Sequence, residues 1–209
     1  MFDIVSDAGL LFSLRGLKQI NVKLCLISYY SFVIIKKIKI ARHVMLITEN
    51  CIIQSIKPNH VEDIYSLYCN EDVRAFLGGV PEKSYIYSSF DRMLQAPLPN
   101  SYFYISLKNK NEFIGLVSID EYHEKTTYEL SYQFLPQYWG KGYAFEVLLA
   151  IIHYGFFSLN LSKIVAETQT ANVASCRVLE KLGMQKVKVL ERFGHEQAVF
   201  QLLKTIEKE

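Results

Sequence analysis

Short apolar segments alternate with polar turns along the chain from about residue 50 onward. An apolar stretch over 50–56 predicts a strand, and apolar residues spaced three or four apart over 58–69 predict an amphipathic helix. A short helix is expected over 71–77, ended by two glycines, and another over 81–94, closed by a region containing two prolines. The first part of this pattern therefore predicts one strand followed by helices.

The next part of the pattern predicts a meander. Three strands are expected over 102–107, 113–119 and 127–135, and the connections between them are short and polar. Connections of this length are typical of antiparallel neighbours. A helix over 141–157 follows, and it is expected to be buried because it is apolar nearly all round.

The last part of the pattern mixes strands and a helix. A strand is expected over 163–167, a helix over 172–182 closed by a glycine, and two strands over 184–190 and 197–203. Strands joined first by hairpins and later through helices predict an α/β (α+β) fold. Its central sheet should be mixed, mostly antiparallel and flanked by helices.

The composition narrows the class of protein. Of 209 residues, 21% are charged and half are hydrophobic, which is enough to build a core, and the net charge of +2 does not favour nucleic-acid binding. The four cysteines lie far apart without a C-x-x-C pair, and the five histidines are scattered. We therefore expect no metal site and no disulfide scaffold, and a reduced, cytoplasmic protein.

The first 44 residues differ from the rest. They hold seven basic and two acidic residues and an apolar run of 12 residues from Leu24 to Ile35. That run is shorter than the ~20 residues that a membrane helix needs, and no small-residue cleavage site follows it. We expect residues 1–44 to be an accessory extension, with a packed element or a membrane-surface contact as alternatives, and residues 45–209 to form the domain. The true start could also be Met45.

The segment 137–144 carries the candidate chemistry. It reads Gln-Tyr-Trp-Gly-Lys-Gly-Tyr-Ala and places two glycines at the start of the buried helix. The first amides of a helix have no partner within it and lie at the positive end of its dipole, so they can bind phosphate. A Walker A loop is absent, and Phe145 stands where a dinucleotide fingerprint needs a small residue. A plain glycine-rich turn is the alternative.

Two motifs together resemble one family. The pattern Gln-x-x-Gly-x-Gly at 137–142 resembles the acetyl-CoA pyrophosphate loop of the GNAT superfamily of N-acetyltransferases, and the run over 172–184 resembles that family's next signature. The Trp-Gly-Lys-Gly-Tyr stretch and the Asn-x-x-Ser helix are more narrowly similar to the RimJ/RimL branch, whose best-known members acetylate the N-termini of ribosomal proteins. The resemblance covers about residues 46–205 and implies a GNAT acyl-CoA N-acyltransferase fold.

The resemblance also implies how acetyl-CoA is bound. The backbone following Gln137 should cradle the pyrophosphate, the end of the preceding strand should pair with the pantetheine, and the next helix should reach the pantetheine arm. The expected cofactor-binding residues are Phe134, Leu135, Gln137, Trp139, Gly140, Lys141, Gly142, Tyr143, Ala144, Asn172 and Ser175. Asn172 could instead act only as a helix N-cap, and Lys141 only as a solvated cation.

Glu129 is the candidate catalytic base. In the strand over 127–135 it lies on a wholly polar face that lines either bulk water or a wet cleft. It also matches a glutamate that is a common general-base candidate in related enzymes, often acting through water. Many relatives carry a tyrosine acid where this chain has Leu179, so the acid is either absent or replaced, with Ser175 as the catalytic candidate.

These residues lead to one function and two alternatives. We expect an acetyl-CoA-dependent N-acetyltransferase that acts directly on a primary amine, possible acceptors including the N-terminus of a ribosomal protein. One alternative is a small-molecule acceptor such as a polyamine or an aminoglycoside. The other is a non-catalytic acyl-CoA-binding protein. The expected partners are acetyl-CoA and the amine, with no nucleic acid, and the pattern leaves the oligomeric state open.

Overall fold

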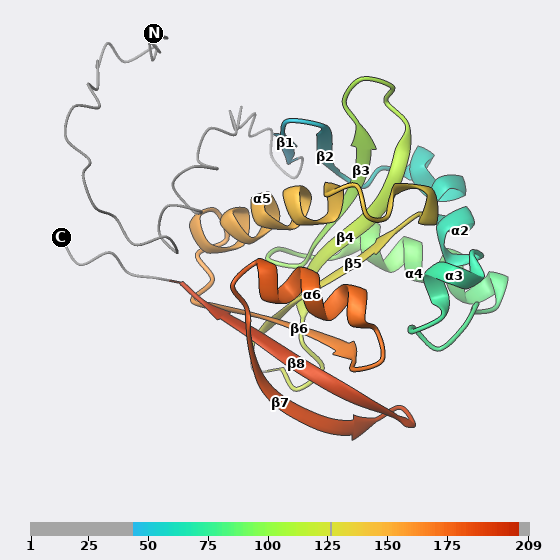
Figure 1. Cartoon of the computed structure of the whole chain (residues 1–209). Helices are drawn as coiled ribbons and strands as arrows, with labels where there is room; N and C mark the ends of the chain where they lie inside the picture. The colour runs from blue at the N-terminus through green and yellow to red at the C-terminus, as the bar shows by residue number, and fades with distance from the viewer. Residues whose placement is uncertain (1–43, 126, 205–209) are drawn as a thin grey trace, which may run out of the picture. The chain divides into compact units, whose positions relative to one another are not determined.

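The computed structural model describes residues 44–125 and 127–204 (Figure 1). The predictions made for residues 1–43 concern a part of the chain outside the described residues. Within these residues the three cysteines, Cys51, Cys69 and Cys176, are free thiols. No helix in the described part is long and apolar enough to cross a membrane.

The helices and strands follow the predicted order. The helices and 3-10 turns are η2 (Pro58–His60), α2 (Val61–Tyr68), α3 (Glu71–Arg74), α4 (Lys83–Gln95), η3 (Pro136–Tyr138), α5 (Tyr143–Phe157) and α6 (Val173–Lys181). The strands are β1 (Met45–Ile47), β2 (Cys51–Ser55), β3 (Ser101–Leu107), β4 (Phe113–Glu121), β5 (Tyr128–Phe134), β6 (Lys163–Gln169), β7 (Gln185–Arg192) and β8 (His195–Leu203).

All of these strands join one eight-stranded sheet in the described part of the chain. Its order is β1-β2-β3-β4-β5-β6-β8-β7. Neighbours are antiparallel except for β5 and β6, which are parallel. The predicted mixed, mostly antiparallel sheet flanked by helices is therefore confirmed, and the single parallel pair marks where hairpin connections give way to helical ones.

Each face of the sheet has its own hydrophobic core. The larger core joins the sheet to α5 and α6, where Val147, Leu148 and Ile151 are fully buried. The smaller core joins the other face to α2, α3 and α4 and includes Ile64 and Phe90. Figure 1 shows α5 and α6 in front of the strands and α4 behind them. Helix α5 is buried as expected, because apolar residues on several sides of the helix pack in the larger core.

The structure differs from the sequence prediction in two details. A strand β1 at Met45–Ile47 was not expected, because three residues are too few to show a period. The helix predicted over 71–77 ends at Arg74, and the chain then continues as turns up to Gly78 and Gly79, both with positive φ. A capping hydrogen bond from the Val73 amide to the Asn70 side chain starts this short helix.

Gly115 in β4 provides a test of sheet packing. A Cβ at this position would lie 2.4 Å from the carbonyl oxygen of Gln133 and 2.8 Å from Cδ1 of Phe134. We expect Gly115→Ala to lower the free energy of unfolding by about 1–3 kcal/mol, because backbone would have to move. Chemical denaturation measures this change. The control Ser66→Ala, at an exposed site in α2, should stay within about 0.5 kcal/mol, and an equal effect of both variants would contradict the assignment.

Candidate active site

The parallel strands β5 and β6 separate soon after they meet. They pair only at Tyr128 with Ile164 and at Glu129 with Val165, although each strand is seven residues long. Beyond this point β5 stays paired with β4, and β6 stays paired with β8. The two strands therefore leave a gap in the ladder of backbone hydrogen bonds.

Some backbone amides and carbonyls of β5 point into this gap and away from β4. Leu135 donates its amide to the Ile114 carbonyl of the neighbouring chain segment before Gly115, at 2.9 Å. Because hydrogen-bonding direction alternates along a strand, Leu130, Tyr132 and Phe134 point their amides and carbonyls away from β4. The Leu135 carbonyl in turn accepts the Tyr138 amide, at 3.0 Å. Leu135 is thus already paired through both backbone groups, and Phe134 is the residue of the expected pair that faces the gap.

The start of α5 lies directly after this strand end. Gly140 and Gly142 have φ values of +70° and +86°, which glycine adopts without strain. No side chain caps the helix, and a Cβ at either glycine would meet nothing within 4 Å. Among the described residues, the amides from Gly140 to Ala144 donate to no acceptor. A row of unpaired donors at the positive end of a buried helix therefore faces open space.

Trp139 does not belong to this row of donors. Its amide already donates to the Pro136 carbonyl at 3.1 Å, so it is not available for the expected pyrophosphate cradle. Its indole nitrogen donates to the Phe134 carbonyl at 2.6 Å. Trp139 therefore ties the glycine loop to the end of β5. Gln137 and Lys141 are exposed, and the Lys141 ammonium lies 5.7 Å from the ring centre of Tyr138.

Helix α6 begins on the other side of the gap. The Asn172 side chain accepts the Ser175 amide at 3.1 Å, so Asn172 is the N-cap that the alternative interpretation described. The Ser175 hydroxyl lies 2.7 Å from the Tyr132 hydroxyl, which comes from β5. Burial raises the pKa of Tyr132 to about 12, so this phenol keeps its proton at neutral pH. Leu179 is fully buried in the larger core.

Tyr132 is a site residue that the sequence analysis missed. Alternation along the strand assigned it to the apolar core, and its ring does pack there. Its hydroxyl nevertheless crosses to α6, because β6 has separated from β5 at this height. The position of a strand separation depends on long-range pairing, so no local pattern in the sequence indicates it.

Glu129 sits at the last paired position before the gap. It lies opposite Asp120 of β4 in the strand register, and its side chain is half-buried. Burial, followed by the charges of Asp120 and Glu167, raises the pKa of Glu129 to about 7. A hydrogen bond from the backbone of Glu167 and the charge of Arg192 act in the opposite direction. On the polar face of β5, Glu129, Ser131 and Gln133 are each half-buried.

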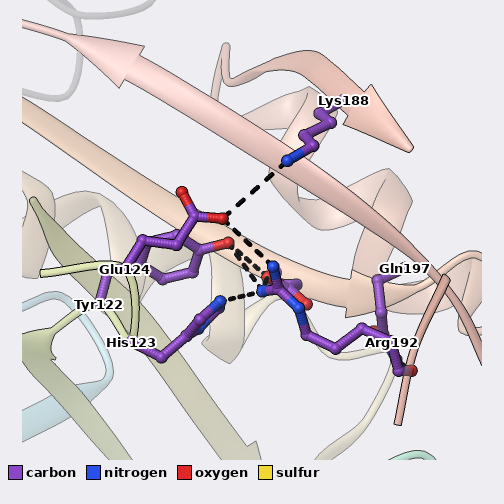
Figure 2. Close-up of polar contacts among 7 residues, drawn as sticks. Tyr122, His123, Glu124, Lys188, Arg192 and Gln197 are labelled. Atoms are coloured by element: carbon purple, nitrogen blue, oxygen red, sulfur yellow. Dashed lines mark hydrogen bonds and ion pairs between the residues drawn. The ribbon is translucent and has the colours of Figure 1, made fainter. Parts of the chain in front are cut away.

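A cluster of polar side chains fixes the neighbouring strand ends (Figure 2). The Oε2 atom of the buried Glu167 accepts the Tyr122 hydroxyl at 2.5 Å and the Arg192 guanidinium at 2.8 Å. Arg192 also contacts the His123 ring and donates to Glu124 at 3.2 Å. The cluster joins the turn after β4 to the β7–β8 hairpin. The second carboxylate oxygen of Glu167 is buried and has no hydrogen-bond partner among the described residues.

A cavity opens on the same face of the sheet as Asp120 and Glu129. Its volume is about 340 Å³, and it lies between the strands and α4. Its walls are mainly polar and aromatic, and its lining includes Tyr68, Tyr85, Arg92, Tyr102, Asp120 and Gln133. No group of three or more His, Cys, Asp or Glu residues in the described part of the chain is placed to hold a metal ion. The cavity borders β5 beyond Glu129, because Ser131 and Gln133 are also among its lining residues.

The chain belongs to the GNAT acetyltransferases. The model of the acetyltransferase (GNAT) domain matches residues 50–185. The chain is also 28% identical over 158 residues to YoaA of Bacillus subtilis, described as an N-acetyltransferase, and the match covers 73% of this chain and 89% of YoaA. It is 39% identical over 84 residues to the B. subtilis N-acetyltransferase YnaD, covering 40% of this chain and about half (49%) of YnaD. The enzyme class is thus an acyltransferase.

Solved structures show the same fold. A GNAT-family acetyltransferase from Bacillus anthracis has a TM-score of 0.67 and 24% identity, covering 77% of this chain and 98% of its own. Spermidine N-acetyltransferase from Vibrio cholerae, in complex with CoA and spermine, has a TM-score of 0.65 and 18% identity, covering 73% and 95%. The ribosomal-protein-S5-alanine acetyltransferase from Vibrio fischeri has a TM-score of 0.64 and 18% identity, covering 79% and 100%.

The Arg192–Glu167 contact gives a test of the cluster. We expect Arg192→Met to lower the free energy of unfolding by about 2 kcal/mol, because the buried Glu167 carboxylate would lose a charged partner. Thermal and chemical unfolding would measure the loss, and adding Glu167→Gln should restore part of it.

The matched control for this test is Lys188→Met. Lys188 lies 4.0 Å from Glu124, and both side chains are about half exposed. Exposed pairs contribute about 1 kcal/mol or less, so this variant should unfold almost like the wild type. If Arg192→Met lowered the free energy of unfolding no more than the control, the cluster would not be what stabilises these strand ends.

Proposed function

We propose that this chain transfers the acetyl group of acetyl-CoA directly to a primary amine. The observation that carries the proposal is the row of unpaired amides from Gly140 to Ala144, next to the gap between β5 and β6. A helix start of this kind suits a pyrophosphate, and an unpaired strand edge suits the amide groups of a pantetheine arm. Both features border the same gap and can hold one extended ligand.

The residues proposed to bind acetyl-CoA follow from these positions. The backbone of Gly140, Lys141, Gly142, Tyr143 and Ala144 would bind the pyrophosphate, with Gln137 at the outer edge of the loop. Phe134 would offer backbone groups to the pantetheine arm, although the indole of Trp139 already uses one lone pair of its carbonyl. Asn172 and Ser175 would border the arm from α6.

Glu129 is proposed as the general base, acting directly or through water. Deprotonating an α-amine of pKa ~8 at pH 7 costs about 1.4 kcal/mol, and a lysine-like amine costs about 4.6 kcal/mol. A carboxylate with a pKa of about 7 is well matched to accept this proton near neutral pH. Most of the acceleration would come from holding the amine and the thioester together, which can supply effective molarities of roughly 10⁵ M or more.

The hydroxyls of Tyr132 and Ser175 are proposed to protonate the leaving thiolate. They are in contact with each other, and they lie beside the gap that would hold the pantetheine arm. Tyr132 is neutral at working pH and can donate its proton. It could therefore replace the tyrosine acid that many relatives carry at the position of Leu179. The presence of such a pair favours catalysis over the alternative of a non-catalytic acyl-CoA-binding protein.

The finer classification belongs to the same proposal. We place the chain near the RimJ/RimL branch, with the catalytic domain at residues 45–209, residues 1–44 as an extension, and the enzyme in the cytoplasm. The strand β1, which starts at Met45 and pairs with β2, supports this boundary. Enzymes named for a ribosomal protein and for spermidine share the fold, so the acceptor is either a protein N-terminus or a small amine.

Substitution of Gly142 tests the cofactor site. We expect Gly142→Val to weaken acetyl-CoA binding by at least about tenfold, because a side chain would project into the space in front of the amides and strain the positive φ. Isothermal titration calorimetry measures the affinity. Gly194→Val, in the β7–β8 turn with a φ of +74° and equally open surroundings, is the matched control. Equal affinity in both variants would remove the loop from the site.

Substitution of Glu129 tests the base. With the wild type, kcat/KM should rise with pH through about 7 as Glu129 loses its proton. Glu129→Gln should lower kcat at least about tenfold and remove this limb, while acetyl-CoA affinity stays the same. Measurements with two acceptors of different amine pKa separate the limb of the enzyme from that of the acceptor. Glu191→Gln, at an exposed site in β7, is the control, and unchanged turnover in Glu129→Gln would assign Glu129 a structural role.

A further inference from the structure

The cavity between the strands and α4 is the proposed acceptor cavity. Two arginines beside it have no carboxylate partner among the described residues. Arg92 of α4 lines the cavity, donates to the Ser89 hydroxyl at 2.7 Å, and lies 5.7 Å from the ring centre of Tyr85. Arg74, at the end of α3, lines an adjoining cavity that shares Tyr85 as a wall. The described residues contain no ion pair that involves either guanidinium. Glu82, which also lines the adjoining cavity, pairs with neither.

Arg74 is notable because it is only half exposed. It donates to the carbonyls of Leu77 at 2.6 Å and Gly79 at 2.9 Å, and to the Gln133 side chain at 3.4 Å. Its guanidinium lies 5.4 Å from the ring centre of Tyr68. Desolvation lowers its pKa, since no carboxylate offsets the burial of the charge. A guanidinium has five N–H donors, so this one keeps donors that no described residue uses.

The cavity lining also contains an acidic side chain. Asp120 lines the cavity and accepts hydrogen bonds from the Tyr102 hydroxyl and the Ser118 hydroxyl, both at 3.1 Å. Glu129 lies opposite Asp120 on the next strand. Burial raises the pKa of Asp120, and its hydrogen bonds with Tyr102 and Ser118 act in the opposite direction. The lining of the acceptor cavity therefore carries both a guanidinium and a carboxylate.

We propose that the acceptor is a small primary amine that also carries a carboxylate or phosphate group. The amine would lie beside Asp120 and Glu129, and the anionic group would lie against Arg92, with Arg74 adding positive potential. This inference rests on the proposed acetyltransferase function and names its substrate class. Charge-assisted bonds from a guanidinium fork suit both anions, which is the chemistry that carboxylate and phosphate share.

The same charges disfavour a polyamine. A polyamine would place a second ammonium where the arginines lie, and like charges at close range are repulsive. The tyrosine walls could bind a cation, but the faces of Tyr68 and Tyr85 already carry guanidinium groups. Because these ring faces are already covered by guanidinium groups, an anionic group suits the surroundings of Arg92 better than an ammonium.

Matched acceptors test the inference. Thiol release from acetyl-CoA is measured with straight-chain ω-amino carboxylates of increasing length, with their primary amides, with ω-aminoalkyl phosphates, and with spermidine. For the wild type we expect kcat/KM for the best acid to exceed that for its amide by at least about tenfold. Comparing carboxylates with phosphates identifies which anion the site prefers.

Variants show whether Arg92 causes this preference. Arg92→Met should reduce the acid-to-amide ratio of kcat/KM to near one, and Arg92→Lys should give an intermediate ratio because the forked geometry is lost. Lys110→Met, which removes an exposed charge in the turn between β3 and β4, should keep the ratio of the wild type. Using the ratio removes any effect of partial unfolding.

Two results would overturn the inference. One is equal rates, or no turnover, for acids and amides by an enzyme that binds acetyl-CoA normally in calorimetry. The other is a preference for spermidine over every acid. Both leave the cofactor site intact, whereas loss of acetyl-CoA binding by the wild type would count against the proposed function itself.

Discussion

The separation of β5 from β6 is the constraint on which the site depends. A parallel pair that continued for seven residues would satisfy every backbone group on both strands and leave nothing for a ligand. Pairing stops after Glu129 and Val165, so the edge of β5 remains open up to Phe134. Because β5 leads into α5 and β6 leads into α6, both helix starts lie next to the same gap. The early end of the β5–β6 pairing thus brings unpaired backbone groups from several parts of the chain next to one another.

The side chains around the gap follow from the same interruption. The strands β4, β5 and β6 bring Asp120, Glu129 and Glu167 onto one face of the sheet, and burial there raises the pKa of Asp120 and of Glu129. Arg192, from the β7–β8 hairpin, pairs with Glu167, and its charge acts against the burial that raises the pKa of Glu129 to about 7. The hairpin therefore pairs with one of two neighbouring carboxylates, and the other carboxylate is the proposed base.

Local sequence patterns predicted most of the fold. Within the candidate site they predicted only the parts formed by one continuous segment. The strand alternation and the glycine loop at 140–142 are short-range signals, and both correspond to features of the structure. The contacts of Tyr132 with Ser175 and of Arg192 with Glu167 join residues 43 and 25 positions apart, and nothing in either segment alone indicates them. Trp139 shows the same limit at short range, because its place in the motif does not reveal that its amide is already used.

The two arginines behind the proposed acceptor preference come from helices outside the proposed cofactor site. The gap and the α5 start are formed by the sheet and the larger core, whereas Arg92 comes from α4, and Arg74 at the end of α3 lines the adjoining cavity together with the turn after it. These helices pack through the smaller core, so they can change without disturbing the backbone amides. Arg74 holds that turn through two carbonyls and also adds charge beside the cavity. A change in the turn would therefore alter acceptor selection before it altered acetyl-CoA binding.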